Sequence, residues 1–244
     1  MRSDVLVVVP TFNEAENLAD LTSAVLALDV RLLIVDNNSP DGTGELAADL
    51  ADGEQMAVLH REEKGGLGPA YAAGFAWGLE HHAQILCEMD ADFSHDPTDL
   101  PRLIEAVDAG ADVVIGSRYV QGGGVADWPV GRRALSRGGN LYASLLLGTR
   151  LKDMTGGYRA IRADAVRRLD PASCRASGYA FQIEMAWKAA TMGMRVTEVP
   201  IVFKDRKRGT SKMTTSIAFE AIRLVTRWGW ARRRGRLPWP VDEL

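Results

Sequence analysis

The chain has 244 residues, of which 46% are hydrophobic and 25% charged, and its formal net charge is −3. This composition is ordinary for a globular protein with one large or two small domains, and it excludes a low-complexity or disordered chain. Two cysteines are too few for a disulfide framework, and no apolar stretch approaches the roughly 20 residues that span a bilayer, so a disulfide scaffold and a membrane-spanning protein are excluded too.

Charge is distributed unevenly along the chain. Residues 204–236 hold 11 Lys and Arg against two acidic residues, a balance of +9, and the tail holds Asp242 and Glu243, so residues 1–203 sum to −10. Such a basic segment is often just a solvated face, but its functional partners are nucleic acids or anionic membranes. It holds few aromatic residues and no nucleic-acid recognition motif, which favours a membrane surface.

The first 115 residues alternate short apolar runs with helical patterns. Continuous apolar runs are typical of parallel strands that are covered on both faces. The alternation predicts a doubly wound, mainly parallel α/β sheet flanked by helices, with its ligands beyond the carboxyl ends of the strands. The predicted strands are Val5–Val9, Leu32–Val35, Met56–Leu59, Ile85–Met89 and Val113–Ile115, and the predicted helices cover about 15–28, 41–51, 68–82 and 98–109.

Beyond residue 115 the pattern is less regular. The predicted elements are a mobile loop at 122–124, a helix that carries Arg132 and Ser136, a turn at 153–159, a helix around 181–184 and a strand at 196–203. We find no internal repeat and no linker. The sequence therefore predicts one domain over residues 1–213 and a basic, amphipathic helical segment without a membrane span over residues 214–244.

The most informative segment follows the fourth predicted strand. Asp90, Asp92 and Ser94 alternate, and alternate side chains of an extended chain point the same way. Three oxygen ligands suit Mg²⁺ or Mn²⁺ held together with substrate phosphates. A calcium-binding EF-hand loop is excluded because His95 and Pro101 stand where that loop needs Gly and Glu. A solvated strand end followed by a helix N-cap remains the alternative.

A glycine-rich segment, Lys64–Gly68, opens the third predicted helix and resembles a phosphate-binding loop. It has neither the spacing of a P-loop nor that of a dinucleotide-binding motif. Both of those nucleotide sites are therefore disfavoured.

Nine motifs together identify a family. They are VVPTFNE (8–14), VDNNSPDGT (35–43), GLGPAY (66–71), MDADFSHDP (89–97), GSRY (116–119), LSRGGN (135–140), DMTGGYR (153–159), FQIE (181–184) and DRKRGTSK (205–212). In this order, over residues 4–215, the chain resembles the family 2 glycosyltransferases of GT-A fold, and among them the polyprenol-phosphate (dolichol-phosphate) mannose synthases.

The resemblance implies a catalytic domain over residues 1–213 that transfers mannose, with inversion, from GDP-mannose to a polyprenyl monophosphate. It implies Mg²⁺ or Mn²⁺ as cofactor and a peripheral place on the cytoplasmic face of the membrane. Carried over residue by residue, it assigns Pro10, Phe12, Glu14, Val35 and Asn37 to the nucleotide, Asp90, Ala91, Asp92 and Ser94 to the metal and diphosphate, Arg118, Arg132 and Ser136 to the acceptor phosphate, and Arg206 and Lys212 to a closing loop.

These residue types suit that chemistry. An acceptor phosphate is anionic near neutral pH, so it needs positioning by arginines more than a general base. Asp92 then serves the leaving group through the metal rather than by taking a proton. The alternative for Arg118 or Arg132 is a structural ion pair.

Two departures from the family pattern matter. Asn37 stands where many relatives carry an acid, which leaves the base selectivity open because an amide offers one acceptor and one donor group. Some relatives also carry C-terminal membrane spans, whereas this chain has an arginine-rich segment with tryptophans, which predicts an interfacial helix or a core-packed one and a separate membrane-anchored partner. The other activities considered are a UDP-glucose-dependent glucosyltransferase and a non-catalytic sugar-nucleotide-binding scaffold.

Overall fold

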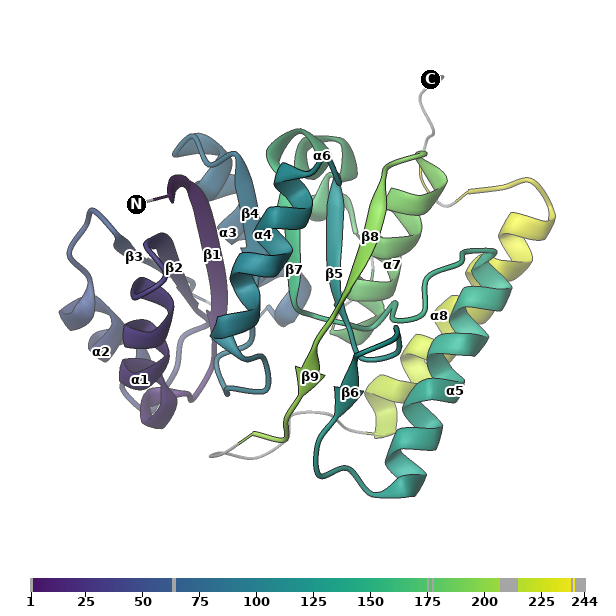
Figure 1. Cartoon of the computed structure of the whole chain (residues 1–244), viewed down its shortest axis with the longest axis horizontal. Coiled ribbons are helices and arrows are strands. Elements are labelled where there is room, and N and C mark those ends of the chain that lie inside the picture. The colour runs from purple at the N-terminus through teal and green to yellow at the C-terminus, as the bar shows by residue number, and fades with distance from the viewer. Residues whose placement is uncertain are drawn as a thin grey trace.

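The computed structural model describes residues 2–62, 65–174, 176, 178–206, 215–237 and 239. Within these residues a seven-stranded sheet carries helices on both faces (Figure 1). In spatial order its strands are β3 (Met56–His60), β2 (Val30–Asp36), β1 (Arg2–Thr11), β4 (Ile85–Glu88), β7 (Arg159–Arg162), β5 (Val113–Ser117) and β8 (Val196–Pro200).

The sheet is mainly parallel, as predicted. Strands β1 to β4 run parallel, β5 pairs parallel with β8, and β7 runs antiparallel between β4 and β5. The register places Thr11 opposite Asp36 and Val8 opposite Glu88, so β1, β2 and β4 end at one edge. The polar residues that follow these strands are thereby brought together.

Two apolar layers cover the sheet because successive side chains of a strand point to opposite faces. On β1, Val5 and Val7 pack in the cluster that contains Leu18 and Leu103, while Leu6 and Val8 pack in the cluster that contains Phe75. The helices of the first layer are α1 (Ala15–Leu26), α2 (Thr43–Leu50) and α4 (Leu100–Asp108), and those of the second are α3 (Leu67–Glu80), α6 (Ala163–Leu169) and α7 (Tyr179–Thr191). Short 3₁₀ turns lie at Pro97–Asp99 and Pro171–Ser173.

Two long helices, α5 (Val130–Leu147) and α8 (Thr215–Arg233), lie side by side at one end of the molecule (Figure 1). They approach closely at Gly229, where the missing side chain leaves room for Leu146: a Cβ at Gly229 would lie 3.1 Å from the Leu146 side chain. Trp228 is buried in the second apolar layer and ties α8 to α7 through its ring contact with Trp187. In the described part of the chain, no helix combines the length and the apolar character needed to cross a membrane.

The irregular half departs from the prediction: helix α6 was not predicted, and strand β6 (Gly124–Val125) begins within the predicted loop at 122–124. The segment predicted as one strand at 196–203 is two strands: β8 ends at Pro200, and β9 (Val202–Phe203) pairs with β6 in a small second sheet. The chain leaves the main sheet at Ile201, whose buried side chain packs in the first apolar layer. Strand β7, which directly follows the predicted turn at 153–159, was not predicted.

Candidate active site

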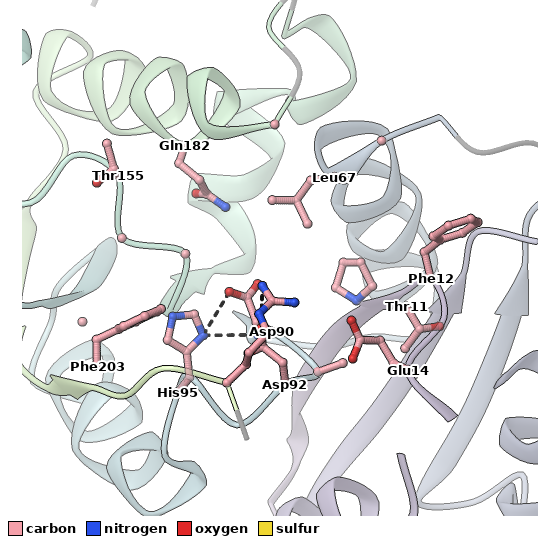
Figure 2. Close-up of a pocket in the computed structure, with 18 of the residues that line it drawn as sticks. Thr11, Phe12, Glu14, Leu67, Asp90, Asp92, His95, Thr155, Gln182 and Phe203 are labelled. Carbon is pink, nitrogen blue, oxygen red and sulfur yellow. Dashed lines mark hydrogen bonds and ion pairs between the residues drawn. The ribbon is translucent and has the colours of Figure 1, made fainter. Parts of the chain in front are cut away.

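A pocket of about 440 Å³ opens at the carboxyl ends of β1, β2 and β4. It is lined by residues from both halves of the chain: Pro10, Thr11, Phe12, Glu14, Asn37, Gly66, Leu67, Asp90, Ala91, Asp92, His95, Gly116, Arg118, Thr155, Gly156, Gly157, Gly178, Gln182, Ile201, Phe203, Arg206 and Glu220. Asp90 and Asp92 lie between His95 on one side and Thr11 with Glu14 on the other (Figure 2).

The turn after β4 is held by its own hydrogen bonds. The backbone N–H of Ser94 donates to Asp92 Oδ1 (3.0 Å), and the backbone N–H of Asp90 donates to His95 Nδ1 (3.2 Å). Phe93, between them, adopts a φ of 59°, a left-handed conformation that reverses the chain. This turn aims both carboxylates into the pocket, whereas the buried Ser94 does not line it.

His95 forms a neutral wall beside the carboxylates. It accepts the Asp90 N–H at Nδ1 and stacks on Tyr158 with a centroid distance of 4.9 Å. Burial lowers the pKa of His95 to about 4, so the ring is uncharged at neutral pH. Accepting at Nδ1 leaves the proton on Nε2.

The two carboxylates crowd negative charge into a small space. Burial and the charge of Asp92 together raise the pKa of Asp90 to about 7. The guanidinium of Arg206 lies 3.1 Å from Asp92 Oδ2 and offsets part of that charge. A cation beside the pair would therefore be stabilised by the site.

A divalent ion fits this donor set. The described residues contain no cluster of three His, Cys, Asp or Glu side chains able to hold a metal by themselves. Mg²⁺ and related ions are commonly held by one or two carboxylates together with substrate phosphates and water. Asp90 and Asp92 supply those two carboxylates beside an open cavity.

The residues predicted to hold the nucleotide divide into two groups. Pro10, Phe12, Glu14 and Asn37 line the pocket, whereas Val35 is fully buried in the apolar layer and does not. The side chain of Asn37 is oriented by its neighbours: its amide donates to the Thr11 carbonyl (3.3 Å), and its Oδ1 accepts from Arg61 (2.7 Å).

Arg118 is fixed on the other side of the pocket. Its side chain donates two hydrogen bonds of 2.7 Å to Asp153 and one of 2.6 Å to Thr155. Burial opposes the charge of Asp153, but the hydrogen bonds from Arg118 outweigh it and keep the pKa of that carboxyl below its ordinary value. The pair is structural, and it also holds a guanidinium at the pocket wall.

Arg118 and Arg132 meet at one aromatic ring. Their guanidinium carbons lie 5.8 and 4.0 Å from the ring centroid of Trp128. Arg132 also pairs with Asp205 (2.9 Å), and Ser136, on the same helix, accepts a hydrogen bond from Tyr119 (2.6 Å). Arg132 and Ser136 do not line the pocket itself. Both arginines thus form the ion pairs that were the alternative to an acceptor role, and they also lie together at Trp128.

A set of buried polar groups at the back of the pocket was not among the predicted site residues. Gln182 donates to Glu88 (2.7 Å), and Arg159 donates to the carbonyl oxygens of Gly156 (2.9 Å) and Gln182 (2.8 Å). Burial raises the pKa of Glu88 to about 7. Gln182 and Gly156 do fall within the quoted FQIE and DMTGGYR motifs, which was the available signal. The predicted loop residue Lys212 lies outside the described residues.

Comparison with known proteins identifies the family. A family model described as "Glycosyl transferase family 2" matches residues 6–170. The chain is 49% identical over 236 residues to a polyprenol monophosphomannose synthase of Mycolicibacterium smegmatis, an alignment that spans 95% of this chain and 88% of the relative. It is 50% identical over 234 residues to an undecaprenyl-phosphate mannosyltransferase of Micrococcus luteus, spanning 94% of this chain and 95% of that protein.

A solved structure supports the fold independently. A glucosyl-3-phosphoglycerate synthase from Mycobacterium tuberculosis, crystallised with Mn²⁺, UDP and glucosyl-3-phosphoglycerate, superposes with a TM-score of 0.63 at 19% identity, over 98% of this chain and 81% of that one. The GT-A fold predicted from the motifs is therefore confirmed, and this chain belongs to glycosyl transferase family 2.

Proposed function

We propose that this glycosyltransferase moves mannose from GDP-mannose to a polyprenyl monophosphate and forms polyprenyl phosphate mannose. One observation carries the proposal: the pocket is lined on one side by a pair of carboxylates suited to a metal–diphosphate and on the other by Arg118, which meets Arg132 at Trp128 and with it suits a second phosphate. The names of the two close relatives support the acceptor and the sugar.

The donor side manages the leaving group. A divalent ion held by Asp90 and Asp92 supplies, when bound, positive charge next to the departing diphosphate. Arg206 lies against Asp92 and adds a second positive charge at the same place. Phe12 and Asn37 line the part of the pocket assigned to the nucleoside, and the donor's sugar would then lie toward the pocket centre.

The acceptor side positions the nucleophile. A phosphate oxygen is already anionic, so it attacks the sugar carbon without a general base. Arginine binds phosphate oxygens in a fixed fork geometry, which orients the nucleophile. Arg118 is rigid because its other contacts, to Asp153 and Thr155, are buried or half-buried. Asp92 accordingly serves the leaving group and takes no proton.

The location proposed for the enzyme is the cytoplasmic membrane face, where its lipid acceptor resides. Helices α5 and α8 expose a set of large apolar side chains to solvent: Val130, Leu135, Leu141, Leu145, Phe219, Ile222 and Trp230. Exposed apolar surface rimmed by arginine is typical of membrane or protein contact. A separate integral-membrane protein is a further proposed partner.

A transfer assay tests the proposal. The protein is incubated with undecaprenyl phosphate, either GDP-mannose or UDP-glucose, and Mg²⁺, Mn²⁺ or EDTA, and radioactive sugar is counted in the lipid fraction. We expect mannose transfer that depends on the metal. Transfer of glucose instead would replace GDP-mannose by UDP-glucose as the assigned donor. No transfer from either donor would refute the proposed transferase activity.

Asp92→Asn is the matching variant. It keeps the shape of the side chain but weakens the grip on the diphosphate, so we expect kcat to fall by at least about a hundredfold. Asp164→Asn, the same exchange at an exposed site on α6, is the control and should leave transfer unchanged. Retained activity in Asp92→Asn would remove the leaving-group role from this turn.

A further inference from the structure

Three consecutive residues after β9 each form an ion pair. Lys204 lies 2.9 Å from Asp96, Asp205 lies 2.9 Å from Arg132, and Arg206 lies 3.1 Å from Asp92. Lys204 and Arg206 contact the turn that follows β4, whereas Asp205 contacts α5. The segment therefore links the side of the pocket that holds the carboxylates to the side that holds the arginines.

Asp205 is bound as an anionic ligand would be. Arg132 donates to both carboxylate oxygens, at 2.9 and 3.1 Å, and the indole Nε1–H of Trp128 donates to Oδ1 at 3.0 Å. Trp128 is 8% exposed, and its ring lies 4.0 Å from the Arg132 guanidinium carbon. The ring can therefore hold the guanidinium in place whether or not Asp205 is there.

Carboxylate and phosphate are alternative partners for this kind of donor set. Both accept from guanidinium groups with similar geometry, and both accept from an indole N–H. We propose that Asp205 is an internal competitor for the acceptor phosphate: it occupies Arg132 and Trp128 until the phosphate displaces it. The inference rests on the proposed function, since it takes Arg132 as an acceptor-binding residue.

The same reasoning adds a residue to the acceptor site. When Asp205 leaves, the Nε1–H of Trp128 loses its acceptor, and a phosphate oxygen beside Arg132 supplies another. Trp128 is thus a binding residue for the acceptor phosphate as well as a support for the two arginines. Its burial fixes the direction of that N–H.

Displacement also changes the segment. Lys204 stays attached at two points, through its ammonium on Asp96 and its backbone N–H on the Ser94 carbonyl (3.2 Å), so the chain remains held beside the carboxylate turn. Arrival of the acceptor would release the segment from α5 alone.

Binding of geranyl phosphate, a soluble isoprenyl monophosphate, tests the competition by calorimetry. We expect Asp205→Asn to lower the dissociation constant about threefold, because a half-exposed ion pair no longer has to be broken. In transfer assays the KM for the polyprenyl phosphate should fall while the KM for the sugar nucleotide stays unchanged. Trp128→Phe, added to Asp205→Asn, should raise the dissociation constant again by removing the second donor.

Asp108→Asn is the matched control. It removes the same charge from an Arg–Asp pair of nearly equal exposure, formed with Arg2 at 2.8 Å. Arg2 begins β1, whose other end leads into the pocket, so the control lies at the far edge of the sheet. We expect its dissociation constant to equal that of the unaltered chain. Geraniol, which lacks the phosphate, should not distinguish any of these proteins.

Several results would overturn the proposal. One is an Asp205→Asn chain that binds geranyl phosphate no better than the unaltered chain. Another is a gain that persists when Arg132→Ala is added, because the competition acts through Arg132. Absence of binding by the unaltered chain would refute the acceptor assignment in the proposed function, and the competition with it.

Discussion

Among the individual residues, Asp153 shows how a buried charge positions a functional one. Its side chain has no exposed surface, and it accepts hydrogen bonds from the backbone and both ends of the guanidinium fork of Arg118. Its own backbone N–H donates to the side chain of Glu198 (2.9 Å), so Asp153 is held through its backbone as well as through its carboxylate. Removing one partner of such a pair leaves the other charge buried without compensation.

We expect Asp153→Asn to lower the free energy of unfolding by about 3 kcal/mol at pH 7. The pKa of Asp153 lies below its ordinary value of 3.8, so its contribution is fully present above that value and is lost as the pH falls through the folded-state pKa. The deficit of the variant should therefore shrink on acidification. Urea unfolding at pH 7, 4.5 and 3.5 measures it, with Asp49→Asn, at an exposed position of α2, as control. A deficit that is equal at every pH would contradict the assignment.

Sequence reasoning predicted which residues lie together where the pattern was local. The alternation of Asp90 and Asp92 at a strand end was enough to direct both into one cavity. Two long-range hydrogen bonds were not predicted. One joins Gln182 to Glu88, 94 positions apart, and the other joins Trp128 to Asp205, 77 positions apart. Contacts across such separations depend on the strand order of the sheet, which no local pattern encodes.

Among the elements, the fit of α3 against the sheet depends on glycine. A Cβ at Gly74 would lie against Val8 and 3.1 Å from Val35 Cγ2. Both neighbours are β-branched residues of the sheet, with little freedom to turn away. A helix that approaches this closely brings its N-terminal turn, with Leu67 and Gly68, to the pocket side of the sheet.

Gly74→Ala should therefore destabilise the fold by about 1–3 kcal/mol through overpacking. Gly138→Ala offers the opposite case, because nothing lies within 4 Å of a Cβ at that position on α5. There the exchange should stabilise by about 0.5–1 kcal/mol, since alanine loses less backbone entropy in a helix. Thermal or urea unfolding of both variants checks the pair, and a Gly74→Ala chain as stable as the unaltered one would show that α3 tolerates the added methyl.

The elements of the first half were predictable for a physical reason. Its strands are continuous apolar runs separated by helices of ordinary length. The hydrophobic pattern and the alternation of strands with helices therefore both predict a doubly wound parallel sheet. The second half breaks this regularity. Strand β7 has four residues, carries charged Arg159 and Arg162 at its ends, and runs against its neighbours. Its apolar pattern is too short to separate from the preceding turn.

At the scale of the whole molecule, charge is strongly polarised in space. Residues 130–147 and 215–236, which include α5 and α8, contain nine arginines and one glutamate, a balance of +8 in a chain of net charge −3, so the other residues sum to −11. The two helices lie together at one end of the molecule (Figure 1). Glu220 on α8 lines the pocket, and Arg132 on α5 meets the pocket-lining Arg118 at Trp128, so this basic end borders the site.

The positive charge and the exposed apolar side chains of α5 and α8 together suit binding to an anionic bilayer. Arg223, Arg227, Arg233 and Trp230 line one groove along α8 with Leu146 of α5. Each arginine near an anionic membrane surface contributes about 1 kcal/mol, an attraction that salt screens. Binding by this end would bring Arg118 and Arg132 toward the phosphate of a lipid acceptor. Charge repulsion would keep the acidic remainder of the chain away from the bilayer.

Arg223→Glu with Arg227→Glu should weaken binding to vesicles that contain phosphatidylglycerol by at least about tenfold, given that contribution per arginine. Sedimentation with sucrose-loaded vesicles measures the bound fraction in low and high salt. Arg167→Glu with Arg168→Glu, on α6, makes the same change of net charge at another surface and is the matched control. If both pairs weakened binding equally, net charge rather than the α5–α8 end would govern attachment. If only the α8 pair weakened vesicle binding, and high salt removed the difference, the α5–α8 end would be the surface that binds the bilayer.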